Sequence, residues 1–425
     1  MKYKKTVLKN GMRIITVPMV ENQTATVVVL VEAGSKYETK EINGVSHFLE
    51  HLCFKGTEKR PTSFDITKEL DGLGAQSNAF TGEELTGYYA KAHKKHLPQL
   101  LDIISDVYLH PVFNKDEIEK EKGVIIDEIS MYEDMPMRDV HDLFMKVLYG
   151  DQPAGWNVAG TKEIVQNMTR EDIVSYRSKH YVATATTVVV VGGGFNEKEL
   201  IKDIEKKFEH INVDKKTGKK KVVSAQKKPE LLIKHKETDQ THLVLGVRTV
   251  DLYHKDNATL NVLTAVLGKG MSSRLFQKLR DEMGVGYYVH ASSNEFTDHG
   301  YLSISTGVNN QRVEEVIKAI IVECKKLTEE EVSKEELKKV KDFIAGNIIL
   351  GLESSDSIAV FYGGQEIFKK PIKSPEQLIK EINVVTAKDI KRLAKSIFKD
   401  EKLNMAIVGP FKDNAPFEKI LTFKE

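Results

Sequence analysis

The stretch "GVSHFLEHLCFKGT", residues 44–57, decides how the rest of the chain is interpreted. At about 100° per residue its apolar side chains share one face of a helix, and these are Val45, Phe48, Leu49, Leu52 and Cys53. His47, Glu50 and His51 share the opposite face, and Asn43 is the expected N-cap. A solvated face usually carries Lys, Glu or Gln, so two imidazoles with a carboxylate between them need a chemical explanation.

The composition excludes several classes of protein. The 425 residues have a net charge of +1, with 40% hydrophobic and 29% charged residues, so the charge favours neither nucleic acid nor an anionic membrane as partner. The two cysteines, Cys53 and Cys324, form no C-x-x-C pair, which fits a reducing compartment. Residues 1–18 lack the apolar core of a secretory signal, and no run of about 18 apolar residues predicts a membrane span. We therefore expect a cytoplasmic protein with no membrane or nucleic-acid partner.

The organisation of the chain repeats on either side of a lysine-rich segment, residues 212–230. Each half has a β-rich run followed by a helix, then a charged helix, then a late strand that ends in glycine. The stretch 78–90 also matches 294–306, at an offset of about 215 residues. We predict an α+β fold of two homologous α/β domains, each a mostly antiparallel sheet with helices packed on it. Residues 1–211 form the first domain, 212–230 a linker and 231–425 the second domain.

The second half indicates that the fold does not require the two histidines. At an offset of about 215 or 216 residues, the positions of His47, Glu50 and His51 are occupied by apolar residues. These are Val262, Ala265 and Val266 at the first offset, or Leu263, Val266 and Leu267 at the second. The polar face in the first half therefore indicates chemistry that the second half lacks.

Histidines four residues apart on one helix face have the spacing that binds one divalent metal ion. The carboxylate between them, Glu50, is placed to act as a general base toward a water beside the metal. The H-x-x-E-H pattern is the inverted counterpart of the H-E-x-x-H pattern of zinc proteases. Alone it is also compatible with two surface histidines on an amphipathic helix. A catalytic zinc site needs one more protein ligand and an open position.

The third ligand is expected from the acidic segment 116–134. Glu121 and Glu128 are seven residues apart and share one face of a helix to within about 20°. Glu128 lies in an apolar stretch that we expect to be mostly buried, where a carboxylate needs a charged partner. We predict that Glu128 is the third ligand and that Glu121 has a catalytic part, positioning a ligand or a water. The alternative is a solvated acidic helix in which Lys120 and Lys122 are the partners.

The pattern resembles the M16, or pitrilysin-type, metallopeptidases, which are also called inverzincins. In that family 76 residues separate H-x-x-E-H from the glutamate ligand, and counting from His51 arrives at Glu128, with the family's additional glutamate at Glu121. The resemblance implies Zn²⁺ as the cofactor. It also implies that "SNAFTGEE", residues 77–84, is an edge strand on which a substrate pairs its backbone, although such a strand also pairs within its own sheet. The implied substrate contacts are Asn78, Ala79 and Phe80.

The second half carries a further family segment, residues 270–289, with an arginine and a tyrosine seven residues apart. These are Arg280 and Tyr287. The resemblance implies that both reach the substrate near the scissile bond and that the tyrosine hydroxyl stabilises the oxyanion. In the alternative interpretation Arg280 pairs within its own helix and Tyr287 lies in the core.

The length resembles that of the small bacterial members of the family, half as long as other pitrilysin-type enzymes and similar to the subunits of mitochondrial processing peptidase. In long relatives the metal lies in the first half, and the arginine and tyrosine come from the second. One half-length chain with both sets implies a homodimeric clamshell, of which each chain forms half. Arg280 and Tyr287 of one subunit would then complete the metal site of the other.

We therefore predict a zinc metalloendopeptidase that hydrolyses peptides or unfolded polypeptide segments inside an enclosed chamber. One alternative is a noncatalytic subunit of a processing peptidase-like complex. Another is an enzyme that needs an unlike partner chain. Because noncatalytic relatives typically lose metal ligands or the base, the complete set in this chain favours the enzyme.

Overall fold

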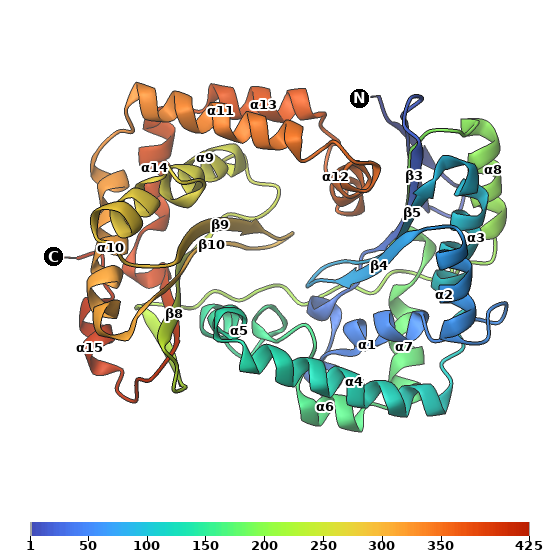
Figure 1. The fold of residues 1–425 in the computed structure, drawn as a ribbon, viewed down its shortest axis with the longest axis horizontal. Helices are drawn as coiled ribbons and strands as arrows, with labels where there is room; N and C mark the ends of the chain where they lie inside the picture. Colours follow the sequence, from blue (N-terminus) through green and yellow to red (C-terminus); the bar gives the residue numbers. More distant parts are fainter. Residues whose placement is uncertain (1, 425) are drawn as a thin grey trace. The chain divides into compact units, whose positions relative to one another are not determined.

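The computed structural model describes residues 2–424, which form two compact units (Figure 1). The first unit contains the chain up to Ile129 together with residues 157–220 and 350–374. The second contains residues 130–156 and 221–349 and the chain from Pro375 onward. Each unit therefore takes segments from both halves of the sequence. The boundaries at 211 and 231 refer to the repeated halves and not to these units, and they remain a prediction.

The first unit is built on a six-stranded sheet in the order β1-β2-β6-β3-β5-β4. The strands are β1 (Lys4–Val7), β2 (Arg13–Pro18), β3 (Thr24–Val31), β4 (Gln76–Thr81), β5 (Thr86–His93) and β6 (Thr186–Gly192). Only the pair β2–β6 is parallel. The mostly antiparallel sheet predicted for the first half is confirmed.

The second unit repeats this sheet without the first strand, in the order β7-β11-β8-β10-β9. The strands are β7 (Glu230–His235), β8 (Gln240–Thr249), β9 (Tyr288–Glu295), β10 (Gly300–Asn309) and β11 (Leu403–Gly409). Again one pair, β7–β11, is parallel and the others are antiparallel. The two sheets have the same strand order along the chain, which confirms the duplicated α/β fold.

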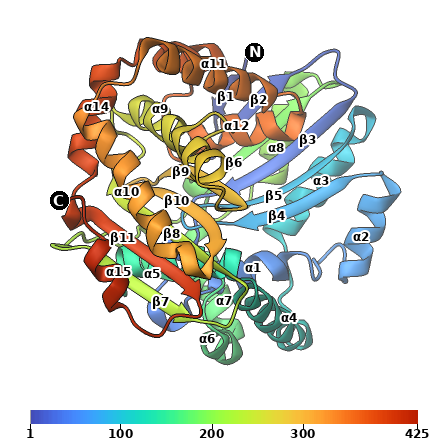
Figure 2. The ribbon, with the colours of Figure 1, turned by 60° about the vertical axis from the view of Figure 1, so that its left-hand side comes forward.

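Helices cover both faces of each sheet (Figures 1 and 2). Those of the first unit are α1 (Val45–Cys53), α2 (Ser63–Gly72), α3 (Leu97–Leu109), α6 (Lys162–Asn167), α7 (Arg170–His180), α8 (Glu197–Lys207) and α12 (Ser355–Ile367). Those of the second are α5 (Pro136–Tyr149), α9 (Asn257–Gly268), α10 (Val313–Glu329), α11 (Lys334–Leu350), α13 (Pro375–Val384), α14 (Ala387–Ile397) and α15 (Ala415–Ile420). Helix α4 (Lys115–Asp134) begins in the first unit and ends in the second.

Strand β3 shows why its sequence is a nearly continuous apolar run. Successive side chains of a strand point to opposite faces of the sheet. Ala25, Val27 and Val29 therefore pack in the core on the α3 side, and Val28 and Leu30 pack in the core on the α12 side. Because both faces are covered, the alternation of apolar and polar residues expected for a half-exposed strand is absent.

Two helices are exchanged between the halves of the sequence. Helix α5 belongs to the first half but packs on β8 and β11 of the second sheet, where Phe144 contacts the backbone position of Gly246. Helix α12 belongs to the second half but packs on β3 and β6 of the first sheet, where Leu30 contacts the position of Gly363. A large residue thus meets a glycine in both units, with the large residue on the helix in one and on the strand in the other.

The lysine-rich segment after α8 forms ion pairs with the first unit. Lys219 forms a 2.9 Å ion pair with the buried carboxylate of Glu84, which also pairs with Lys36. Lys216 pairs with Glu32. The first part of the segment is therefore fixed to the first unit by charge.

No single helix within residues 2–424 is long and apolar enough to cross a membrane. Helices α11 and α12 together have the length and apolar composition of a membrane span, but the chain bends by 111° between them.

The close packing of α12 gives a matched pair of substitutions. A Cβ at Gly363 would lie 2.6 Å from Leu30 and 3.0 Å from Val189, whereas a Cβ at Gly364 meets nothing within 4 Å. We predict that Gly364→Ala stabilises the protein by about 0.5–1 kcal/mol through helix propensity. Gly363→Ala should instead destabilise it by about 1–3 kcal/mol through overpacking. Urea denaturation of both variants measures the difference, and equal effects would contradict the packing described for α12.

Candidate metal centre and active site

Three side chains of α1 and α4 bring their donor atoms together. The Nε2 atoms of His47 and His51 lie 3.6 and 3.5 Å from Oε2 of Glu128, and the two imidazole ring centroids are 4.6 Å apart. Four tetrahedral ligands at zinc–donor distances near 2.0–2.1 Å would be about 3.3–3.4 Å from one another. Within residues 2–424 no other group of three His, Cys, Asp or Glu residues offers ligand atoms this close together. The spacing fits one divalent metal ion.

Helix α4 carries Glu128 on a half-exposed face. The Glu128 side chain is 23% exposed and Val124 is 49% exposed, while Ile125 and Ile129 are buried. The expectation that this stretch is mostly buried is therefore wrong for one face of the helix, because the 3.6-residue period turns that face away from the core. Glu128 consequently meets its partners at the edge of the core.

Glu121 lies one heptad before Glu128 and is buried. Its Oε1 atom is 2.9 Å from Nδ1 of His51, and its Oε2 atom is 2.7 Å from Nζ of Lys55. A carboxylate on the far nitrogen of a metal-binding imidazole fixes the ring and its tautomer. The alternative partners are engaged elsewhere, since Lys120 pairs with Glu117 and Lys122 with Glu119.

The carboxylate between the histidines is half-buried and oriented. Thr81 Oγ1 donates a 2.6 Å hydrogen bond to Oε2 of Glu50. Burial raises the pKa of Glu50, although this hydrogen bond and the nearby His51 act in the opposite direction. The Thr81 hydroxyl therefore holds one oxygen of the carboxylate while the other remains available.

The electrostatics of the site favour a cation. Burial, aided by the neighbouring His51, lowers the pKa of His47 to about 4, so its imidazole is neutral at pH 7, as a metal ligand must be. Burial alone would lower the pKa of His51, but the bond to Glu121 and the charges of Glu50, Glu121 and Glu128 raise it. Three carboxylates thus surround two imidazoles, and their excess negative charge attracts a divalent ion.

Helix α1 begins at a buried carboxylate instead of the expected Asn43 cap. The N-cap is Gly44, and Glu38 accepts hydrogen bonds from the backbone N–H groups of Gly44 (2.7 Å) and Ser46 (2.8 Å). Asn43 donates to the same carboxylate at 2.9 Å, so Asn43 as the N-cap was wrong. Gly44 has φ of +98°, and a Cβ there would lie 2.5 Å from the carbonyl oxygen of Ala159. Only glycine fits this position.

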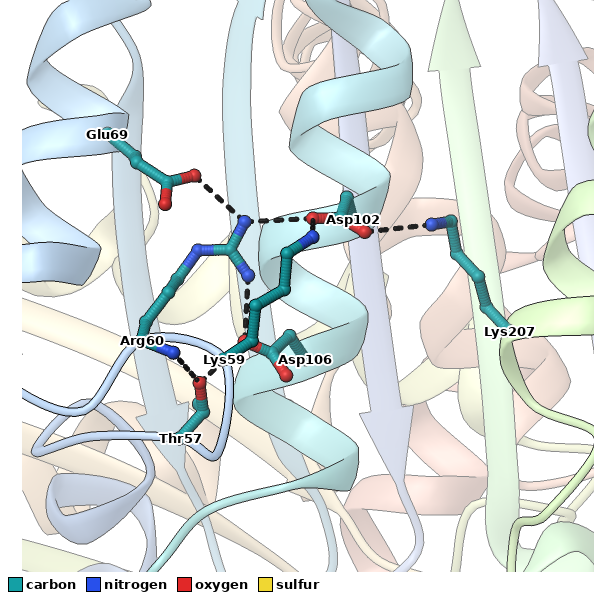
Figure 3. A network of polar contacts seen from close by, with 7 residues as sticks. All are labelled: Thr57, Lys59, Arg60, Glu69, Asp102, Asp106 and Lys207. Carbon is teal, nitrogen blue, oxygen red and sulfur yellow. Dashed lines mark hydrogen bonds and ion pairs between the residues drawn. The ribbon is translucent and has the colours of Figure 1, made fainter.

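The loop after α1 is fixed by a buried guanidinium, that of Arg60 (Figure 3). Its guanidinium donates to Asp106 at 2.7 Å and to Asp102 and Glu69 at 2.8 Å. Its backbone N–H donates to Thr57, whose hydroxyl donates to Asp106. Because Asp102 and Asp106 lie on α3, this network ties the exit of α1 to the helix that covers the sheet.

The predicted substrate strand is the edge strand β4. It is last in the order of the six-stranded sheet and pairs with β5. Asn78 is exposed, and Ala79 and Phe80 are half-buried. The Ala79 N–H donates to the side chain of Asn78 at 2.8 Å. Since α1 packs beside β4, this strand runs next to the helix that carries His47 and His51.

Arg280 and Tyr287 belong to the second unit. Arg280 lies in the π-helical turn Phe276–Glu282 and donates to the carbonyl oxygen of Gly286 at 3.1 Å. Tyr287 is the residue after Gly286, and it is 77% exposed. The alternative interpretation, in which Tyr287 lies in the core, was therefore wrong. Both side chains are available to a molecule outside the unit.

Comparison with known proteins identifies the family. The family model described as "Insulinase (Peptidase family M16)" matches residues 13–162, and that described as "Peptidase M16 inactive domain" matches residues 167–343. The chain belongs to peptidase family M16. The first match covers His47 and His51 of α1 and Glu121 and Glu128 of α4. The second covers most of the half that lacks them.

Relatives of similar length support the same family. An uncharacterized zinc protease of Bacillus subtilis, YmxG, is 34% identical over 96% of this chain and 98% of its own length. An uncharacterized zinc protease of Mycobacterium leprae is 32% identical over 96% of this chain and 92% of its own. The crystal structure of a protease from Helicobacter pylori has a TM-score of 0.91, with 26% identity over 96% of this chain and 99% of that one. A structure from Pseudomonas fluorescens titled as an M16 inactive domain has a TM-score of 0.89 at 16% identity and shares the fold.

Two residues that orient this M16 site were not predicted from the sequence. Glu38 lies six residues before the N-cap, outside the few positions that capping rules cover. Its role depends on the chain folding back onto α1. Thr81 lies inside the quoted segment "SNAFTGEE", but its contact with Glu50 joins positions 31 residues apart. Only the alternation of side chains along β4 hinted that Thr81 shares a face with Ala79.

The buried cap gives a prediction for the helix that carries His47 and His51. Glu38→Ala leaves the N–H groups of Gly44 and Ser46 buried without an acceptor, so we predict a loss of about 2–5 kcal/mol in the free energy of unfolding. Zinc affinity should fall by about 10-fold or more, because His47 lies in the first turn of the same helix. Urea denaturation and zinc titration measure the two effects. Glu41→Ala, at an exposed glutamate three residues later, is the control, and an equal loss in both variants would contradict the capping role.

Proposed function

We propose that this M16 protein is a zinc metalloendopeptidase and that His47, His51 and Glu128 bind the zinc ion. The observation that carries the proposal is the convergence of two imidazole nitrogens and a carboxylate oxygen, with distances of 3.5 and 3.6 Å, next to Glu50. Two imidazoles and one carboxylate form a ligand set typical of catalytic zinc, with one position left for the reaction. The relatives named as zinc proteases support the choice of metal.

The metal and the protein have separate tasks in this proposal. When bound, zinc supplies Lewis-acid chemistry, since it lowers the pKa of an adjacent water and polarises the scissile carbonyl. Glu121 holds His51 in the tautomer that presents Nε2 to the metal. Lys55 neutralises Glu121, so this carboxylate does not compete as a ligand.

Glu50 moves the proton. Its free oxygen accepts a proton from the attacking water as the water oxygen bonds to the carbonyl carbon. The same proton then passes from Glu50 to the leaving nitrogen as the C–N bond breaks, giving a carboxylic acid and an amine. Glu50 returns to its starting state, so no other reactant is consumed. The raised pKa of Glu50 suits a group that both accepts and donates a proton.

Strand β4 would bind the substrate. An extended peptide that adds to the free edge of a sheet gains backbone hydrogen bonds without a particular side-chain sequence. The edge position of β4 supports this role for Asn78, Ala79 and Phe80. Such binding selects peptides or unfolded segments, which we propose are cut within an enclosed chamber. The unpaired, buried state of Cys53 and Cys324 is compatible with a reducing, cytoplasmic location.

Removal of the base tests this function directly. We predict that Glu50→Gln keeps about one zinc per chain but lowers cleavage of a quenched fluorescent peptide library by about 10²–10⁴-fold. Metal analysis of the same preparations separates loss of the base from loss of the ion. Glu119→Gln, at an exposed glutamate on α4, is the control and should cleave like the wild type.

Two results would contradict the proposal. If wild type binds zinc but cuts no peptide, the noncatalytic subunit is the better interpretation and a partner chain is required. If neither wild type nor Glu50→Gln binds zinc, the three converging side chains have another role.

A further part of the proposal concerns the roles of Arg280 and Tyr287. The exposure of both side chains supports contact with a substrate or a second chain. We propose that the protein is a homodimer in which this pair from one subunit completes the metal site of the other. The tyrosine hydroxyl then donates a hydrogen bond to the developing oxyanion.

Mixing two inactive variants tests completion in trans. Glu50→Gln removes the base, and Tyr287→Phe removes the hydroxyl, so each homodimer should lose at least about 10²-fold in kcat. In a mixed dimer one site receives both intact residues, and random association should restore roughly a quarter of wild-type activity. No recovery in mixtures, or full activity of a wild-type monomer, would contradict the arrangement.

A further inference from the structure

The hydrogen bond between Thr81 and Glu50 joins the two parts of the site that have different tasks. Thr81 is the last residue of β4, the proposed substrate strand, and Glu50 lies on α1, the metal-binding helix. The 2.6 Å distance from Oγ1 to Oε2 is typical of a hydroxyl that donates to a carboxylate. The proposed base is therefore held by the strand that would hold the substrate.

The strand fixes the hydroxyl in place. Thr81 pairs with Thr86 across the hairpin, which is closed by a 2.9 Å bond from Gly82 N to the carbonyl oxygen of Leu85. Ala79 packs in the core on the α1 side, whereas Phe80 packs on the other side with the α12 core, so the alternation directs Thr81 toward α1. A β-branched side chain also has few rotamers. The donor therefore has little freedom.

Glu50, in contrast, has a flexible side chain. It has three rotatable bonds and is only partly buried, so the Glu50 side chain can adopt other rotamers where no hydrogen bond restrains it. The hydroxyl of Thr81 occupies Oε2 and leaves Oε1 for the proton of the water. The hydroxyl can donate to a carboxylate and, more weakly, to the carbonyl oxygen of a carboxylic acid, so the contact persists when Glu50 gains or loses its proton.

We propose that Thr81 is a positioning residue that orients Glu50 for proton transfer. This inference rests on the proposed function of Glu50 as the base. It assigns to β4 a task besides substrate pairing, since the strand that would bind the substrate backbone also orients the carboxylate of Glu50. Correct orientation of a catalytic group affects the rate of the chemical step more than ground-state binding.

The kinetic test compares Thr81→Val, which keeps the shape but lacks the hydroxyl, with Thr81→Ser, which keeps the hydroxyl. Thr81→Val should lower kcat by about 10–100-fold with KM within about twofold of wild type, and Thr81→Ser should recover kcat to within about threefold. Zinc content should equal that of wild type in both. The control is Thr86→Val, which removes the opposite hydroxyl of the hairpin, bonded to the carbonyl oxygen of Ala33, and should not change kcat.

Three results would overturn the inference. An unchanged kcat in Thr81→Val excludes a role for the hydroxyl. If KM of Thr81→Val rises by as large a factor as kcat falls, or if this variant loses zinc, the strand has a structural role instead. A fall in Thr81→Ser as large as in Thr81→Val shows that shape matters and the hydroxyl does not.

A crystal structure of metal-free Thr81→Val gives a readout that is independent of activity. We expect Glu50 to leave its wild-type conformation or to occupy several. A single, unchanged Glu50 conformer would overturn the positioning role even if peptides are cleaved. If Thr81→Val does release Glu50 while wild-type protein cuts no peptide, the proposed function fails and the contact remains as a structural restraint on Glu50.

Discussion

The buried carboxylate of Glu38 at the start of α1 is the constraint on which the site depends. A nine-residue helix is too short to be stable alone, and the residues that carry its first N–H groups are buried. Glu38 accepts from two of these groups, and Arg60 fixes the loop beyond the other end through carboxylates on α3. With both ends held by buried hydrogen bonds, His47 and His51 have fixed positions in the absence of a metal. Preformed ligands reduce the conformational entropy that metal binding must overcome.

The duplicated fold shows that the same scaffold accepts either an apolar or a polar face at this helix. Both units use the same strand order, and the helix after the third strand of the first unit corresponds to α9 in the second. In α9 the positions aligned with the ligands are apolar and buried, so that helix is part of the core. In α1 the equivalent face is polar, and it meets the carboxylate of Glu128 from α4 and the hydroxyl of Thr81 from β4. In α9 this face is used for packing, whereas in α1 it presents two imidazoles and a carboxylate.

Much of this could be predicted from the sequence because the signals are local and periodic. The H-x-x-E-H helix, the acidic helix over 116–134 and the alternating strands each follow from residues near one another in the chain. The spacing from His51 to Glu128 predicted Glu128 as the distant ligand through resemblance to a family, and in the structure the donor atoms of His47, His51 and Glu128 lie close together. The predicted roles of Arg280 and Tyr287 remain proposals.

The features that escaped prediction depend on contacts between distant segments. Nothing in the periodicity of α5 or α12 tells which sheet each helix covers, since both sheets present a similar apolar face. The matched sizes at Leu30 with Gly363, and at Phe144 with Gly246, become visible only in three dimensions. The cap by Glu38 likewise required the path of the chain before α1. Capping rules describe neighbours in sequence, and here the acceptor is a neighbour in space.

The most direct test of the account is to locate the metal itself. Anomalous diffraction at the zinc edge from crystals of the zinc-loaded protein reports the position of the ion independently of activity. The account predicts one strong peak about 2.0–2.2 Å from Nε2 of His47, Nε2 of His51 and a carboxylate oxygen of Glu128, with Glu50 nearby but not bound. A peak elsewhere, or a zinc ion ligated by Glu50 in place of Glu128, would contradict it.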